Sequence, residues 1–149
     1  MAEYLAQPGV QTALNATPIP FYASIPCTKR YILHEDGTGI FILRGITNNC
    51  SAKYLVKFTG NIAVPEGGTV GPIAVALTVN GEPVLATRAI VTPAAVGDYF
   101  NVAIEKEITI PQGCCFNVAI EPVSAYNDTT APAPAINYQN ARIGITRTA

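Results

Sequence analysis

The chain has 149 residues, of which 49% are hydrophobic and only 13% are charged, and its formal net charge is −1. This length fits a single domain. The nine Lys and Arg residues are scattered, with Lys29–Arg30 as the only adjacent pair, so no basic patch marks a nucleic-acid partner.

Half the usual charge, against roughly 25% in an average soluble domain, leaves a weakly charged surface. We therefore expect burial against identical copies or in a larger assembly. The first residues carry no basic region or apolar stretch of signal-peptide length, and no apolar run is long enough to span a membrane. We expect synthesis in the cytoplasm without Sec targeting, and no membrane partner.

Residues 1–28 differ from the rest of the chain because Pro8, Pro18, Pro20 and Pro26 recur among small polar residues. Each proline removes a backbone donor and favours extended geometry. The segment is predicted to be an extended N-terminal arm, with a short strand near residues 19–23. It either reaches a neighbouring subunit or remains a mobile tail. Residues 29–149 are predicted to form the folded domain.

From Tyr31 onward, short apolar segments alternate with turn signals, as in a sandwich or barrel. Residues 31–33 lead into a Gly-rich turn at 34–39, and residues 40–46 read as a strand. Residues 52–64 show the clearest period of two, which predicts a half-buried antiparallel strand. On its inner face we expect five residues: Tyr54, Val56, Phe58, Ile62 and Val64.

Residues 73–79 form the next predicted strand, and Asn80-Gly81 after it supplies the two positive-φ positions of a type I′ hairpin turn. The return strand is predicted to continue to about Thr92, with Pro83 at a sheet edge. Both the 73–79 strand and residues 84–91 carry apolar side chains on both faces. We therefore expect another subunit to cover the second face.

Residues 99–110 alternate again, and Lys106 interrupts the apolar face at a predicted bulge or sheet rim. After the turn at 111–113, residues 114–122 run back as a strand, and a loop follows from 124 to 134. The last predicted strand pair is 135–138 and 141–146, joined around Gln139-Asn140. With no helical apolar stripe, the chain is predicted to be an all-β jelly-roll sandwich of about eight to ten antiparallel strands with an extended N-terminal arm.

Two small groups could carry chemistry. His34, Glu35 and Asp36 would make a metal or carboxylate site, but they also fit a polar β-turn, which is the interpretation we favour. Glu105 and Glu107 share one strand face, with Glu121 expected nearby, and such a carboxylate pair can hydrolyse glycosides. Without an aromatic sugar platform, a solvated strand face is the favoured interpretation. We expect no catalytic residue, no cofactor and no metal site.

The four cysteines are Cys27, Cys50, Cys114 and Cys115. We expect them to be reduced, buried thiols, although a Cys27–Cys50 bridge stays open. Adjacent Cys114 and Cys115 point to opposite faces of a strand, so a bond between them would be strained. The spacing contains no CxxC pair and so predicts no zinc site.

Three stretches carry a family resemblance: YILHEDGTGIFILRGI at 31–46 with the strand at 54–62, GPIAVALTVNGEP at 71–83, and YFNVAI at 99–104 leading to ITIPQG at 108–113. Together they resemble small structural proteins of phages and prophages. The fold of those proteins is similar to the trimeric TNF-like and complement-type globular-head jelly roll. The resemblance covers roughly residues 30–149 and leaves the N-terminal arm outside.

The resemblance implies a non-enzymatic virion protein, a capsid decoration or head-fibre protein that assembles as a homotrimer. Its partners would be copies of itself and the major capsid protein or another virion protein, with docking through the N-terminal arm. The alternative is a receptor- or glycan-binding module at a fibre tip or bacterial surface. That module would use Tyr126, Asn127, Asp128 and Tyr138.

Overall fold

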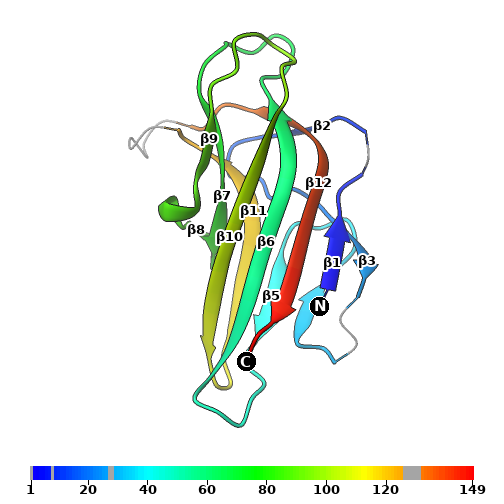
Figure 1. The fold of residues 1–149 in the computed structure, drawn as a ribbon, viewed down its shortest axis with the longest axis vertical. Helices are drawn as coiled ribbons and strands as arrows, with labels where there is room; N and C mark the ends of the chain where they lie inside the picture. Colours follow the sequence, from blue (N-terminus) through cyan, green and yellow to red (C-terminus); the bar gives the residue numbers. More distant parts are fainter. Residues whose placement is uncertain (1, 8, 27–28, 126–131) are drawn as a thin grey trace.

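The computed structural model describes residues 2–7, 9–26, 29–125 and 132–149, which pair into two antiparallel sheets stacked as a sandwich (Figure 1). The sheet nearer the viewer in Figure 1 is called the front sheet. Its strand order is β10 (Phe100–Pro111), β6 (Ser51–Ala63), β12 (Ile136–Arg147), β1 (Ala2–Leu5) and β3 (Tyr22–Ile25). β2 (Gln11–Ala13) also pairs with β12. The back sheet has the order β4 (Ile32–His34), β5 (Phe41–Arg44), β11 (Cys115–Val123), β7 (Ile73–Val79) and β8 (Glu82–Pro83), and β9 (Ala89–Val91) also pairs with β7.

Consecutive long strands alternate between the two sheets. β5, β7 and β11 lie in the back sheet, whereas β6, β10 and β12 lie in the front sheet. The chain therefore crosses from sheet to sheet at almost every long connection, which is the winding of a jelly roll. The predicted all-β jelly-roll sandwich is confirmed. The described residues hold twelve strands rather than eight to ten, partly because the N-terminal segment adds strands of its own.

The core lies between the sheets and is built by the predicted alternation along β6. Tyr54, Val56 and Phe58 are all buried, as expected. Phe58 meets Phe21 with ring centroids 6.3 Å apart, and Phe21 lies 5.8 Å from Phe41 on β5. Such offset and edge-on ring pairs add to the hydrophobic stabilisation of both sheets. No helix in the described ranges is long and apolar enough to cross a membrane.

The N-terminal segment differs from the predicted arm. Its backbone is extended, as expected, but it is part of the sandwich: Ala2 pairs with Ile145 on β12, and the backbone N–H of Ile19 donates to the carbonyl oxygen of Ile120 at 2.9 Å. Ala2, Ile19 and Phe21 are fully buried. Burial of these scattered apolar side chains holds the segment against the sheets, whereas its prolines had suggested a piece that stands apart.

The Asn80-Gly81 hairpin is confirmed, because both residues have positive φ, at 52° and 85°, and Val79 pairs with Glu82. The return strand is shorter than predicted. After β8 the chain forms a 3-10 turn, η1 (Leu85–Thr87), and then β9. The Thr87 hydroxyl accepts the N–H of Leu77 and donates to the carbonyl of Val84, so a side chain replaces the strand ladder at this point.

The cover on β7 also differs from expectation. Ala74 and Ala76 point away from the core, yet both are buried, and they cluster with Val123 and Ala125 of the same chain. A second subunit is therefore not needed to cover this strand. Residues 84–91, in contrast, do leave Leu85 and Ile90 exposed.

The predicted hairpin at the C-terminal end is wrong. Residues 136–147 form one strand, β12, whose register against β6 shifts between Gln139 and Arg142. Asn140 has a φ of 53°, and the extra residue makes a β-bulge instead of a turn.

Lys106 was predicted to lie at a bulge or at a sheet rim. It lies on β10, an edge strand, so the rim position is confirmed. The register between β10 and β6 is unbroken, so there is no bulge at Lys106. Lys106 pairs with Val56, so its side chain lies on the inner side of the sheet. An inward-pointing charge on an edge strand discourages pairing with a further strand.

Candidate functional site

His34 is the last residue of β4, just before the turn to β5, and only 1% of its side chain is exposed. Its Nε2 donates to the carbonyl oxygen of Thr38 at 2.8 Å, and its ring stacks on Phe41 with centroids 4.3 Å apart. Asp36 accepts the backbone N–H of Ala23 at 3.0 Å, and Gly37 has a φ of 85°. These contacts support the polar-turn interpretation of the three residues. The described residues contain no group of three His, Cys, Asp or Glu that could hold a metal ion.

Glu105 and Glu107 share the outer face of β10, as predicted, but each faces a lysine of β6. The Nζ of Lys57 lies 4.0 Å from Oε2 of Glu105, and the Nζ of Lys53 lies 3.9 Å from Oε1 of Glu107. Glu121 is not near them, because it lies on β11 in the back sheet. The placement of Glu121 near this pair is therefore wrong, whereas the ion pairs of Glu105 and Glu107 support the favoured interpretation of a solvated strand face.

Three of the four residues of the alternative binding function, Tyr126, Asn127 and Asp128, lie outside the described residues. The fourth, Tyr138, is on β12 with only 2% of its surface exposed. Burial, and after it the neighbouring Tyr22, raises the pKa of Tyr138. A buried phenol in a central strand is not a loop residue for a ligand.

The prediction of buried thiols is wrong for three cysteines, because Cys50, Cys114 and Cys115 are free and exposed. The reason is local: Cys114 closes the turn after β10, where its N–H donates to the carbonyl of Pro111 at 3.0 Å. The expectation that Cys114 and Cys115 do not bond to each other is confirmed. Cys27 lies outside the described residues.

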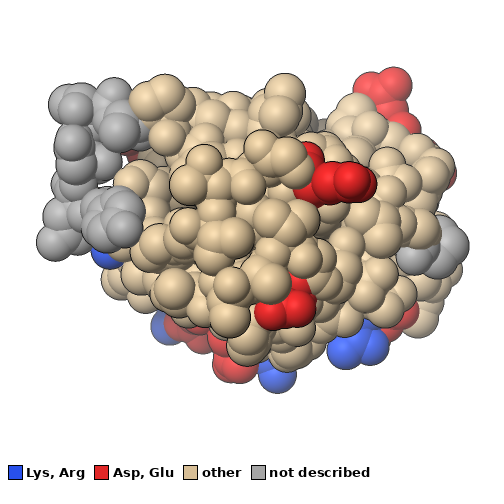
Figure 2. Space-filling view, turned by 90° about the horizontal axis from the view of Figure 1, so that it is seen from above, with Lys and Arg blue, Asp and Glu red and all other residues tan. Residues whose placement is uncertain are grey.

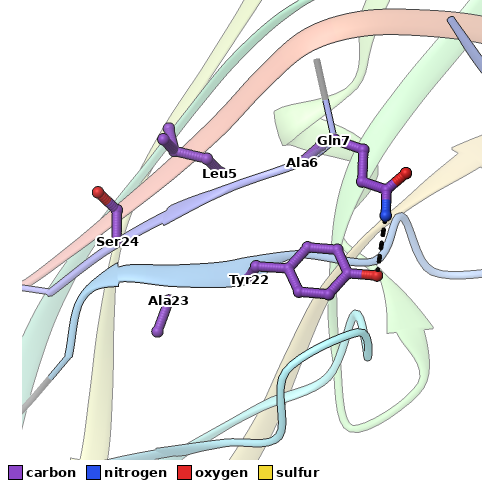
Figure 3. A pocket seen from close by; sticks show the side chains of 6 residues that line it. All are labelled: Leu5, Ala6, Gln7, Tyr22, Ala23 and Ser24. Atoms are coloured by element: carbon purple, nitrogen blue, oxygen red, sulfur yellow. Dashed lines mark hydrogen bonds between the residues drawn. The ribbon is translucent and has the colours of Figure 1, made fainter. Parts of the chain in front are cut away.

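A shallow pocket of about 400 Å³ opens at one lateral edge of the front sheet, between β1 and β3 (Figure 3). The amide of Gln7 donates to the hydroxyl of Tyr22 at 3.3 Å across it. Leu5, Tyr22 and Ile25, here the β1–β3 patch, are between 39% and 48% exposed. This edge therefore offers apolar surface with few charges.

The opposite edge of the sandwich, where β9 of the back sheet lies beside β10 of the front sheet, carries a second exposed apolar group. Leu85, Ile90 and Phe100, here the β9–β10 patch, are between 44% and 47% exposed. β10 contacts both β9 and η1, so the three elements lie side by side at this edge of the sandwich.

The end of the molecule seen in Figure 2 carries few charges. Figure 2 looks onto the upper end of the molecule in Figure 1, and most of the atoms shown belong to uncharged residues. Charges of both signs gather along the lower margin of that view, on the side of the front sheet.

The sequence pattern did not indicate the two patches. The apolar residues on both faces of 84–91 were a signal for Leu85 and Ile90, and Phe100 was expected on the inner face. Its position at the start of an edge strand exposes it instead. Leu5 and Tyr22 gave no signal because they lie in the segment predicted to be an arm.

The fold is similar to that of the globular domain of zebrafish complement 1qA protein. The two align with a TM-score of 0.56 over 99% of this chain and 97% of that chain, at 14% identity. At this identity the likeness concerns the fold alone, and it confirms the complement-type jelly roll that the sequence resembles. No family model matches the sequence, and no curated protein matches it.

Proposed function

We propose that this protein is a non-enzymatic structural module that assembles as a homotrimer on a virion, as a capsid decoration or head-fibre protein. The observation that carries the trimer is the pair of exposed apolar patches at opposite edges of the sandwich. A two-fold dimer would bury one patch against itself and leave the other exposed. A ring in which the β9–β10 patch of one copy meets the β1–β3 patch of the next buries both.

The number of subunits and the setting rest on the family resemblance of residues 30–149, and the complement-type fold supports the ring of three. The non-enzymatic role is supported by the lysine partners of Glu105 and Glu107 and by the buried position of His34 in its turn. Because residues 2–5 and 22–25 are strands of the front sheet, the proposal does not use a free docking arm.

Light scattering on the full chain at micromolar concentration tests the trimer. The expected mass is three times the chain mass of 15.7 kDa. A monodisperse monomer would overturn the proposal. Copurification with assembled particles tests the setting separately, and a trimer that is absent from purified particles would refute the virion role.

Two substitutions test the head-to-tail geometry. Leu5→Asp and Phe100→Asp each place a carboxylate in one exposed patch, so each variant is expected to be a folded monomer. An equimolar mixture keeps one intact interface between unlike chains and is expected to form heterodimers but no ring. Leu33→Asp, on the back sheet and also exposed, is the matched control and should remain trimeric. If the mixture stays monomeric while the control is trimeric, the patch pairing is wrong.

A further inference from the structure

The outer face of the back sheet holds a second pocket, of about 240 Å³. Pro18 and Ile40 form its apolar wall. Residues 18 and 19 run beside β11, and Gly39 allows their close approach, because a Cβ on Gly39 would lie 2.6 Å from the Cβ of Pro18. The end of β7, the β7–β8 turn and β11 supply the remaining lining residues: Thr78, Asn80, Gly81, Asn117, Val118, Ala119 and Glu121.

Two polar side chains in this pocket already have partners within the chain. The side-chain oxygen of Asn80 accepts the backbone N–H of Asn117 at 2.9 Å. The hydroxyl of Thr78 donates to the carbonyl of Ala119 at 3.4 Å. Their contacts hold the β7–β8 turn against β11, so the shape of the pocket is set before any ligand binds.

Glu121 differs from these residues, because its carboxylate makes no hydrogen bond or ion pair with a described residue. Arg88, which directly precedes β9, donates through its guanidinium to the carbonyl of Ser124 at 3.1 Å. Partial burial raises the pKa of the Glu121 carboxyl above its ordinary value. A partly buried carboxylate without a partner lowers the stability of the folded state. Residues that lower stability in this way are typical of binding sites.

We propose that this pocket binds a primary ammonium group on an aliphatic stem, as presented by a lysine side chain of a protein partner. The ammonium group supplies the positive charge that Glu121 lacks, and the stem lies along Pro18 and Ile40. A small, partly enclosed site with a single carboxylate suits a compact cation with rotatable donors. The site lies on the back sheet and uses neither of the two edge patches, so it goes beyond the proposed trimer.

NMR titration of the ¹⁵N-labelled full chain with n-butylammonium tests this site. Saturable shifts are expected at the backbone amides of Thr78, Asn80, Gly81, Asn117 and Ala119. Neutral 1-butanol should bind at least about tenfold more weakly, because it lacks the charge. Equal binding of butanol would show an apolar hollow without charge recognition. Tighter binding of n-butylguanidinium would overturn the assignment to lysine.

Glu121→Gln keeps the shape of the side chain and removes the charge, so saturable binding of n-butylammonium should weaken at least about tenfold. Glu82→Gln, on the exposed β8 strand, is the matched control and should bind like the native chain. The native chain provides a second test. Its affinity for n-butylammonium should fall on acidification, because Glu121 takes up a proton. Unchanged affinity in Glu121→Gln, or a flat pH profile, would refute the proposal. The trimer mass is measured independently of these outcomes.

Discussion

On the outer face of the front sheet, charged residues stand in rows, with Lys57 beside Glu105 and Lys53 beside Glu107, all about half exposed to water. On the back sheet, Ala74 and Ala76 are buried and cluster with Val123, and the carboxylate of Glu121 is partly buried without a partner among the described residues. Both faces are outer faces of the same sandwich. The front one is solvated, whereas part of the back one holds a small buried apolar cluster.

The difference shows that position on an outer face does not by itself decide exposure. Alternation along a strand separates inward from outward side chains, but a neighbouring segment can cover the outward ones. Exposed ion pairs contribute little because water competes for both partners, whereas a partly dehydrated single charge carries a penalty. Substitutions at matched positions on the two faces should therefore have unequal effects.

The largest expected difference is between Ala74→Lys and Thr59→Lys. Ala74 is buried on the outer side of β7 between Val123 and Ile90, so a lysine there would lower the unfolding free energy by about 3–5 kcal/mol, because its charge would be buried and unpaired. Thr59 lies on the outer face of β6, where a lysine should change stability by at most about 0.5 kcal/mol. Urea unfolding measures both, and equal losses would contradict the distinction between the faces.

A smaller difference is expected for two glycines. In Gly39→Ala the new Cβ would lie 2.5 Å from the carbonyl oxygen of Ile19, so residues 18–19 must move, at about 1–3 kcal/mol. In Gly144→Ala, on the front sheet, the Cβ meets nothing within 4 Å, and stability should stay equal or rise by up to about 1 kcal/mol. Thermal unfolding of the two variants gives the comparison. A destabilised Gly144→Ala with an unaffected Gly39→Ala would reverse it.

The smallest effect concerns pH. Since the pKa of folded Glu121 is raised above 4.5 by burial, the folded state holds its proton more tightly than the unfolded state. The stabilisation of the folded state by this proton is fully present below the pKa of the unfolded chain and is lost as the pH rises through the folded pKa. Glu121→Gln should remove this dependence and raise neutral-pH stability by a few tenths of a kcal/mol at most, because the carboxyl is still partly solvated.

The control for that effect is Glu105→Gln, which removes one partner of an exposed ion pair. It should lower neutral-pH stability by at most about 0.5 kcal/mol, so the two variants shift in opposite directions. Urea midpoints at acidic and neutral pH measure both. Loss of stability in Glu121→Gln at neutral pH would show that the carboxylate has a partner that stabilises it.

Much of the fold could be predicted because its determinants are local. The alternation of Tyr54, Val56 and Phe58 predicted the inner face of β6, and Asn80-Gly81 predicted its hairpin from the φ preferences of two residues. Asn140 also adopts positive φ, but there the same preference makes a bulge. The outcome depends on the partner strand, since Gly60 of β6 leaves room for Ala141.

The candidate sites were harder to predict because they depend on contacts between distant segments. Glu121 was grouped with Glu105 and Glu107 by sequence proximity, but the turn after β10 sends β11 into the other sheet. The patch residues Leu5 and Phe100 are 95 positions apart, and their roles follow from lying at opposite edges of the sandwich.

By itself, the sequence determined that this chain is an all-β sandwich with little surface charge, because side-chain period, turn residues and composition act over a few positions. Only the tertiary structure decided that β1, β2 and β3 belong to the front sheet, that Ala76 is covered from outside, and that Glu121 stands apart from the other two glutamates. Burial depends on which segments meet across the whole chain, and the jelly-roll winding brings together residues that no local pattern connects.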